Sequence, residues 1–213
     1  MNVAMLVIII CSYNNERWIE KNLDSVFNQQ YENYRIIYID DCSTDSTVEK
    51  VTAYLKIHDT KHRCTFIQNK TRQYKLYNFY HAVHEHCNDD EIIVELDGDD
   101  WLLGDNLFKK INAIYGYEVW LTYGGFTMWP IQYDYLATQQ IPKEVITQNL
   151  FRQYHRTGYI FIALRTFYAG LFKKIRKEDL MENGEFFKRS SDVATMIQMF
   201  EMAGERFCHI MEQ

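Results

Sequence analysis

The chain contains, between residues 92 and 101, the stretch Ile92-Ile93-Val94-Glu95-Leu96-Asp97-Gly98-Asp99-Asp100-Trp101. Its first half is a short apolar run with β-branched residues, which is typical of a buried strand. Three carboxylates follow directly, interrupted by one glycine, so we expect them at the carboxyl end of that strand. Carboxylates this close repel one another unless a cation neutralises them, and a hard divalent metal ion is their natural partner. Gly98 lets the backbone turn sharply or lets a ligand approach closely.

The same acids have a purely structural interpretation. They could form a polar turn that caps a helix beginning near Asp105, since Asp and Gly are common in ordinary turns. The stretch alone does not decide between a site and a turn. The decision depends on which other side chains reach the same end of the sheet.

The composition is that of an ordinary globular protein. The 213 residues are 47% hydrophobic and 24% charged, and this length suffices for one domain with a substantial core. The formal net charge is −6 and no block of Lys and Arg stands out, which argues against nucleic acid as a partner. The five cysteines are widely spaced without a Cys-x-x-Cys pair, which favours reduced thiols over disulfides or a zinc site.

The start of the chain gives an expectation about location. Residues 3–10 are mostly apolar, but this run is too short to span a bilayer. It also lacks the basic leader and the cleavage site of a signal peptide. We therefore expect no transmembrane segment and a cytoplasmic protein.

The first half of the chain repeats one design, in which an apolar strand ends in polar residues and a helical pattern follows. We expect strands at residues 7–10, 36–39, 64–68 and 92–96, and helices at 16–29, 46–57 and 73–86. Strands that alternate with helices predict an α/β fold with a mostly parallel sheet flanked by helices on both faces.

Polar side chains follow several of these strands. In parallel sheets, ligands bind at the carboxyl ends of the strands. Tyr13, Asp41, Asp97 and Asp99 all lie at such positions. Four polar side chains at one edge are more than an isolated acidic turn would supply, so the pattern favours a site.

The second half of the chain is less regular. We expect helices at residues 105–115, at 164–175 and from Ser191 onward, strands at 119–123 and 207–211, and a loop at 130–147. The helix that begins at Ser191 has an apolar face made of Val193, Met196, Ile197 and Phe200. Gly124 and Gly125 predict a bend or a point of close backbone approach.

Several common motifs are missing. The chain has no G-x-G-x-x-G after its first strand and no G-x-x-x-x-G-K-[ST] sequence, which disfavours a dinucleotide site and a P-loop. It also has no G-x-S-x-G nucleophile elbow. A bound phosphate would therefore be held through a metal ion and side chains.

Three motifs together resemble a known family. They are Ile8-Ile9-Ile10-Cys11-Ser12-Tyr13-Asn14-Asn15, Ile39-Asp40-Asp41-Cys42-Ser43-Thr44-Asp45 and Leu96-Asp97-Gly98-Asp99-Asp100. In this order and spacing they resemble the GT-A glycosyltransferases of family 2. Trp120-Leu121-Thr122-Tyr123-Gly124 and Leu164-Arg165-Thr166-Phe167 resemble a subgroup of it. The resemblance implies one GT-A domain over residues 1–213, with residues 1–103 binding the nucleotide and 104–213 the acceptor.

The resemblance also implies a reaction. A hexosyltransferase-type enzyme of this family moves a sugar with inversion from a nucleotide sugar, usually a uridine diphosphate sugar, with Mn²⁺ or Mg²⁺. Tyr13 would flank the uracil, and Asp41 would accept a hydrogen bond from it. Asp97 would meet the ribose or a metal-bound water, and Asp99 would ligate the metal ion that bridges the diphosphate. That ion would offset the charge on the leaving diphosphate.

Two parts of the expected nucleotide-sugar site depart from the family pattern. Cys11 and Ser12 stand where many members carry Pro or Thr, so we expect Cys11 to contact the ligand through its backbone, next to Asn14 in the same motif. The helix after the third strand lacks the usual Gly and Ala-Arg-Asn spacing. Arg72, Lys75 and Asn78 are its polar residues that could face the diphosphate. Arg165 is a further candidate, because its planar fork suits phosphate oxygens.

An inverting transfer needs a base that takes the proton of the acceptor hydroxyl. Asp192 is the candidate, because family members commonly carry an acid at the start of a late helix. An Asp beside Ser191 is equally suited to cap that helix. Further candidates are Glu178, Asp179, Glu182 and Glu185.

The acceptor is open to a saccharide, a protein or a lipid. Trp101 directly follows the acids, and its flat face suits the apolar face of a pyranose, whereas Trp120 and Trp129 are expected in the core.

Two other functions stay open at this stage. A sugar nucleotidyltransferase shares a similar fold, but it usually carries a Gly-rich loop with Lys or Arg after the first strand, where this chain has Ser12-Tyr13-Asn14-Asn15. A non-catalytic module could keep the nucleotide pocket without turnover.

Overall fold

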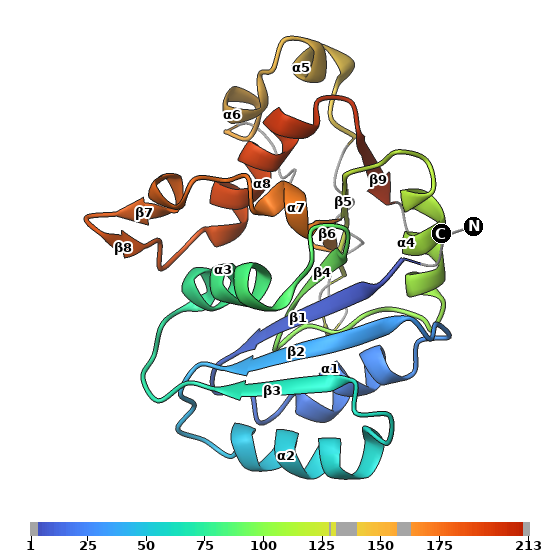
Figure 1. Cartoon of the computed structure of the whole chain (residues 1–213), viewed down its shortest axis with the longest axis vertical. Coiled ribbons are helices and arrows are strands. Elements are labelled where there is room, and N and C mark those ends of the chain that lie inside the picture. The colour runs from blue at the N-terminus through green and yellow to red at the C-terminus, as the bar shows by residue number, and fades with distance from the viewer. Residues whose placement is uncertain (1–3, 128, 131–139, 157–162, 211–213) are drawn as a thin grey trace.

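The computed structural model describes residues 4–127, 129–130, 140–156 and 163–210. Within them, one seven-stranded sheet has the order β3-β2-β1-β4-β6-β5-β9 (Figure 1). The strands of this sheet are β1 (Leu6–Ser12), β2 (Tyr34–Asp40), β3 (Cys64–Gln68), β4 (Ile92–Asp97), β5 (Leu121–Gly124), β6 (Arg165–Tyr168) and β9 (Phe207–Ile210). β1 to β4 pair in parallel, β6 is antiparallel to β4 and β5, and β9 is parallel to β5. The predicted α/β fold with a mostly parallel sheet is confirmed.

Helices cover both faces of the sheet. The helical segments are α1 (Ile19–Phe27), α2 (Thr47–His58), α3 (Lys75–His86), α4 (Leu107–Tyr115), α5 (Lys143–Thr147), α6 (Phe151–Tyr154), α7 (Ala169–Phe172), the 3₁₀ turn η1 (Lys177–Leu180) and α8 (Ser191–Ala203). A short hairpin of β7 (Met181–Glu182) and β8 (Glu185–Phe186) projects beside α3 (Figure 1). No helix among the described residues is both long and apolar enough to cross a bilayer.

The alternation of side chains along β1 divides the core into two layers. Val7 and Ile9 pack with α3, α7 and α8, while Leu6, Ile8 and Ile10 pack with α1, α2 and α4. All five side chains are fully buried. A strand buried on both faces reads as a continuous apolar run, because each side chain meets a helix on its own side of the sheet.

The expected elements of the first half are confirmed, with their ends moved by a few residues. The predicted helix at 16–29 is shorter, because α1 covers Ile19–Phe27. Of the predicted strand at 207–211, Phe207–Ile210 is confirmed as β9, and residue 211 lies outside the described residues. Gly124 is a point of close approach as expected, since a Cβ there would lie 3.2 Å from the carbonyl oxygen of Ile210.

The prediction of one helix at residues 164–175 is wrong. Arg165–Tyr168 form β6, and only Ala169–Phe172 continue as α7. β6 inserts between β4 and β5 and pairs with both, and this long-range pairing overrides the local helical pattern. The register places Arg165 opposite Glu95.

The predicted loop at 130–147 is also partly wrong. Lys143–Thr147 form α5, which starts directly after Pro142. Proline fits the start of a helix because its missing N–H is not needed there. Residues 131–139 of this segment lie outside the described residues.

Candidate functional site

The acidic residues 97–100 form a turn whose backbone is held from two sides. Gly98 N–H donates to the carbonyl oxygen of Cys11 on β1 at 3.1 Å. From α1, the fully buried side chain of Asn22 donates to the carbonyl oxygens of Asp97 at 3.0 Å and Asp100 at 2.7 Å. The turn is therefore a fixed part of the fold, because one buried amide spans it.

Gly98 is required by its protein neighbours. A Cβ at this position would lie 2.6 Å from Asn15 Nδ2 and 2.7 Å from Ser12 Cβ. The close approach expected from the sequence is thus made by the loop after β1. This contact brings the loop and the acidic turn together at one edge of the sheet.

The acids do not cap the following helix. α4 begins at Leu107 after Asn106, and no side chain caps its first turn. The structural interpretation of the acids as a helix cap is therefore wrong. Asp99 and Asp100 are exposed at the sheet edge, and Asp97 is half-buried.

Behind the turn lies a buried group of charged side chains. Arg165 donates through Nε and Nη2 to the two carboxylate oxygens of Glu95, each at 3.1 Å. Lys75 Nζ lies 2.8 Å from Glu95 Oε1 and also contacts the carboxylate of Asp97. Arg165 further approaches Asp97 at 3.7 Å and Asp192 at 3.5 Å. Two cations are thus shared among three carboxylates from β4 and α8.

These contacts determine the ionisation of the group. Burial alone would raise the pKa of Glu95, but the positive charges of Arg165 and Lys75 hold it below its ordinary value. The pKa of Lys75 is raised, because the attraction of Glu95 and Asp97 outweighs its desolvation. Pairs of this kind stay charged in the interior because each charge has a partner.

The outer part of the turn is electrostatically different. Desolvation, followed by repulsion from Asp97 and Asp99, raises the pKa of Asp100 to about 6. The cations behind the turn therefore do not fully neutralise it. The exposed side of the turn keeps an excess of negative charge.

Asp192 lies in the first turn of α8 but does not cap it. The residue before the helix is Ser190, with a φ of 54°, and no side chain caps the helix. The capping interpretation of Asp192 is therefore wrong, and its carboxylate is directed to Arg165. The four reserve acids are exposed on η1 and the β7–β8 hairpin, where Asp179 pairs with Arg176 and Glu185 with Lys188.

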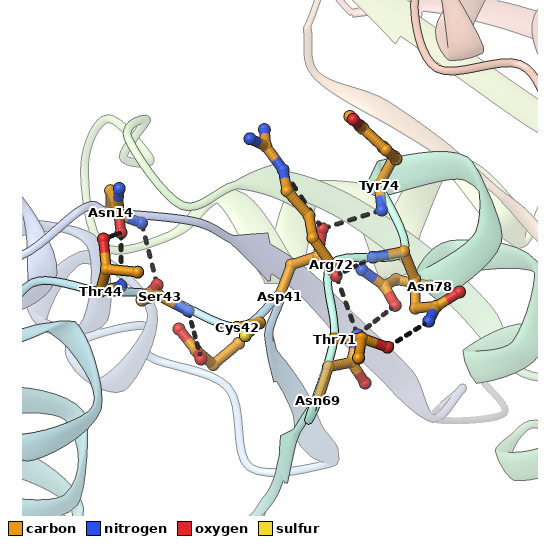
Figure 2. A network of polar contacts seen from close by, with 12 residues as sticks. Asn14, Asp41, Cys42, Ser43, Thr44, Asn69, Thr71, Arg72, Tyr74 and Asn78 are labelled. Carbon is orange, nitrogen blue, oxygen red and sulfur yellow. Dashed lines mark hydrogen bonds and ion pairs between the residues drawn. The ribbon is translucent and has the colours of Figure 1, made fainter.

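Asp41 is the centre of a second polar cluster, at the ends of β2 and β3 (Figure 2). Its Oδ1 accepts hydrogen bonds from Asn69 Nδ2 at 2.9 Å and from Gln73 N–H at 2.8 Å, and its Oδ2 accepts one from Tyr74 N–H at 2.8 Å. Burial would raise the pKa of Asp41, but these donors together with Asn78 lower it. The buried carboxylate therefore stays ionised.

Tyr13 and Arg72 complete this cluster. The Arg72 guanidinium carbon lies 3.6 Å from the centre of the Tyr13 ring, and Arg72 Nε lies 3.9 Å from Asp41 Oδ2. Of the three polar candidates around α3, Lys75 faces the acids after β4, Arg72 faces Tyr13, and Asn78 accepts a hydrogen bond from Asn69. The structure thus separates their positions.

Asn14 and Cys11 contribute mainly through the loop after β1. Asn14 has a φ of 54°, its N–H donates to Ser43 Oγ at 2.9 Å, and its Oδ1 accepts from Thr44 N–H at 2.8 Å (Figure 2). It therefore joins the loops after β1 and β2. Cys11 uses its carbonyl oxygen to hold Gly98, and burial raises the pKa of its thiol.

A cavity of about 500 Å³ opens beside the acidic turn. Asp97, Asp99 and Asp100 line one side, and Trp101 lies among its other lining residues. A larger cavity of about 990 Å³ lies at the opposite end of the sheet, where Met5 and Glu91 precede β1 and β4. Of these two cavities, the smaller adjoins the acidic turn, so this end of the sheet holds the candidate site.

The chain is similar to a known protein family. The family model described as glycosyl transferase family 2 matches residues 7–180. The chain belongs to this family. The matched range includes both polar clusters and ends before Asp192.

Relatives within the family are distant. An uncharacterized glycosyltransferase of Haemophilus influenzae is 26% identical over 145 residues, covering 68% of this chain and 56% of that protein. Another from the same organism is 36% identical over 74 residues, covering 32% of this chain and 23% of that protein. The chain therefore spans about half or less of the length of these two relatives.

Solved structures share the fold. The structure of S. aureus TarS 1–349 in complex with UDP has a TM-score of 0.66 at 17% identity, covering 98% of this chain and 58% of that one. A mannosyltransferase from Pyrobaculum calidifontis, solved with GDP-Man and Mn²⁺, has a TM-score of 0.67 at 17% identity, covering 100% and 57%. The family 2 chain thus has the GT-A fold.

Sequence reasoning missed part of the candidate site. Glu95 was counted as a strand residue, although a charged side chain in an apolar strand signals a buried partner. Trp129 was expected in the core, which is wrong, because 53% of its surface is exposed. Trp18, directly before α1, also lines the cavity.

We expect Asp41→Asn to destabilise the protein by about 1–3 kcal/mol near neutral pH, since an amide cannot accept all the hydrogen bonds of the carboxylate. The pKa of Asp41 is lower in the folded state, so its contribution is complete above the unfolded value of 3.8 and is lost as pH falls through the folded pKa. Urea unfolding of both proteins should show a difference that shrinks in acid. An unchanged difference would contradict the assignment, and the exposed Asp90→Asn serves as control.

We expect Arg165→Met to cost about 3–5 kcal/mol, because it leaves Glu95 buried with Lys75 as its remaining cation. Glu95→Gln combined with Arg165→Met should cost less than the sum of the single changes. Chemical unfolding of the four proteins measures this coupling. Additive effects would show that the pair does not stabilise the sheet.

Proposed function

We propose that the chain is a metal-dependent glycosyltransferase that moves a sugar from a uridine diphosphate sugar to an acceptor hydroxyl with inversion. The main support is the convergence of two clusters at one sheet edge: Asp41 with Tyr13 and Arg72, and the acidic turn with Lys75. The first suits a nucleoside and the second a charged diphosphate. TarS was solved with UDP and the Pyrobaculum calidifontis mannosyltransferase with GDP-Man and Mn²⁺, which supports a nucleotide-sugar donor.

In this proposal the uracil lies against Tyr13, and the ionised Asp41 accepts a hydrogen bond from its ring N–H. Arg72 covers Tyr13 and approaches Asp41, so it borders the base. Asn14 and the backbone at Cys11 shape the loop that carries Tyr13. Lys75 lies closer to the diphosphate, because its ammonium already faces Asp97.

The residues of the turn fit a divalent ion that is shared with the substrate. The described ranges contain no group of three His, Cys, Asp or Glu side chains arranged to hold a metal ion by themselves. Mg²⁺, like similar hard ions, is often held by one or two carboxylates together with phosphate oxygens. We assign the ion to the exposed Asp99. Asp97 lies behind Asp99, where its carboxylate contacts Lys75 and Arg165. When bound, the ion stabilises charge on the leaving diphosphate.

Asp192 is the proposed base. Its carboxylate is half-buried and held 3.5 Å from Arg165, which orients it toward the group behind the acidic turn. In the transfer, the acceptor oxygen forms a bond to the anomeric carbon while the bond from that carbon to the diphosphate oxygen breaks. The hydroxyl proton goes to Asp192, and the nucleoside diphosphate leaves.

We propose that residues 1–213 form one domain with two roles. Residues 1–103 supply the nucleotide cluster and the turn, and residues 104–213 supply Asp192 and the acceptor side. The loop after β1 holds no Gly-rich basic sequence, so nothing there favours a nucleotidyltransferase.

Calorimetric titration with UDP tests the donor site. We expect binding to the unaltered protein to tighten with Mn²⁺, and Asp99→Asn to weaken the Mn²⁺-dependent binding by roughly tenfold or more. Asp90→Asn, an exposed change at the opposite end of the sheet, should bind like the unaltered protein. Equal Mn²⁺ dependence in Asp99→Asn would remove the metal assignment, and no binding of UDP would overturn the proposed donor.

Asp192→Asn tests the base. We expect this nearly isosteric change to lower kcat by about 100- to 10,000-fold, because the amide cannot accept the proton. UDP affinity should stay within about twofold, since Asp192 is placed on the acceptor side. UDP release from UDP-sugars with saccharide acceptors measures the rate, and Asp179→Asn is the matched control. Unchanged turnover would exclude Asp192 as the base.

A further inference from the structure

Three tryptophans gather beside the acidic turn. We call Trp18, Trp101 and Trp129 the tryptophan wall. The ring centres of Trp18 and Trp101 lie 5.9 Å apart, and Trp129 meets Trp18 at 6.0 Å and Trp101 at 6.3 Å, each edge to face. They come from the start of α1, from the end of the acidic turn, and from the segment after β5.

Two cationic side chains contact the rings of the tryptophan wall. Lys21 Nζ lies 3.6 Å from the ring centre of Trp101 and 4.4 Å from that of Trp129, and the Arg17 guanidinium carbon lies 4.7 Å from the Trp18 ring. Such cation–π contacts hold aromatic rings at exposed positions. The wall is therefore ordered by side chains of α1 and its approach, although it is not part of the core.

The tryptophan wall still presents apolar surface. Trp18 and Trp101 are half-buried, 53% of Trp129 is exposed, and the neighbouring Leu103 is 44% exposed. Large apolar side chains gathered at one surface position commonly mark a binding site. This surface lines the cavity of about 500 Å³, whose size lies within the range of about 300–1,000 Å³ found for small-molecule pockets.

The same cavity is also lined by carboxylates. Asp97, Asp99 and Asp100 line it together with Thr127. The lining of the cavity therefore combines aromatic rings with hydrogen-bond acceptors. A pyranose has this double character, because its C–H groups form an apolar face and its hydroxyls donate hydrogen bonds around the rim.

Other ligand classes match the cavity less well. An acyl chain would fit the rings but would desolvate the carboxylates without giving them a hydrogen bond, which is costly. The nucleotide cluster is separate, because Tyr13, Asp41 and Arg72 do not line this cavity.

We propose that the cavity between the tryptophan wall and the acidic turn binds a pyranose ring of the acceptor, so that the acceptor is a saccharide. This inference rests on the proposed function. In the proposed function, the donor sugar is linked to the diphosphate near Asp99, and the nucleoside lies near Asp41. The cavity lies beside the same turn and takes in Arg165, which holds Asp192, so a sugar bound there lies next to the transfer centre.

Tryptophan fluorescence tests the subsite without requiring turnover. The full chain is titrated with methyl pyranosides of glucose, galactose, mannose and N-acetylglucosamine, and separately with UDP and Mn²⁺. The variants are Trp129→Ala, Trp101→Ala and the conservative Trp129→Phe. Trp120→Phe is the matched control, since Trp120 is half-buried and also lies under two cations, Arg206 at 4.3 Å and Lys174 at 5.8 Å, outside this cavity.

We expect at least one pyranoside to give a saturable change in the unaltered protein and in Trp120→Phe. Its Kd should rise roughly tenfold or more in Trp129→Ala and less in Trp129→Phe, while the UDP Kd stays within about twofold. Trp129 is exposed, so this variant keeps the test valid if Trp101→Ala fails to fold.

Three outcomes would overturn the inference. UDP binding without binding of any pyranoside would leave the donor site intact and remove the sugar subsite. Pyranoside binding that is unchanged in Trp129→Ala and Trp101→Ala would place the sugar elsewhere. Binding of phosphatidylcholine vesicles that Trp129→Ala abolishes, with no pyranoside bound, would assign the wall to a lipid surface. If the unaltered protein bound a pyranoside but did not bind UDP, the result would instead contradict the proposed function.

Discussion

The ion pair between Arg165 and Glu95 is the interaction on which the site depends. Both side chains are buried, and they face each other across adjacent antiparallel strands at two contacts of 3.1 Å. Burying two charges is costly unless their geometry is good and further partners complete it. Here Lys75 supplies the additional partner on Glu95. The pair thereby fixes β6 against β4 and fixes a guanidinium directly behind the acidic turn.

The pair also divides the acidic turn into two sides. Asp97 faces inward to Lys75 and Arg165, whereas Asp99 and Asp100 are exposed. The charge of Asp97 is therefore balanced within the protein, while Asp99 and Asp100 face solvent. Through Arg165, the same group also holds Asp192 of α8, so one side chain connects the proposed donor and acceptor sides.

Helix α1 joins this electrostatic centre to the tryptophan wall. Asn22 holds the backbone of the acidic turn, and Lys21 on the same helix covers Trp101 and Trp129. Trp18 lies directly before the first turn of α1. One short helix therefore contacts both the tryptophan wall and the acidic turn.

The first four strands, their order along the chain and the polar residues at their ends can be predicted from the sequence alone. These signals are local, because a buried parallel strand is a continuous apolar run and the residues after it are polar. Tyr13, Asp41 and the acidic turn could therefore be predicted to meet at one edge. The strength of that prediction came from several strands pointing to the same edge.

The way in which the second half of the chain completes the candidate site depends on contacts between segments that are distant in sequence. Residues 165–168 became a strand instead of a helix, because they pair with β4 and β5. That pairing joins Arg165 to Glu95, 70 residues apart, and no local pattern encodes such a contact. The contact of Asp192 with Arg165 and the exposure of Trp129 follow from the same assembly of distant segments, since each depends on which surfaces the folded chain leaves uncovered.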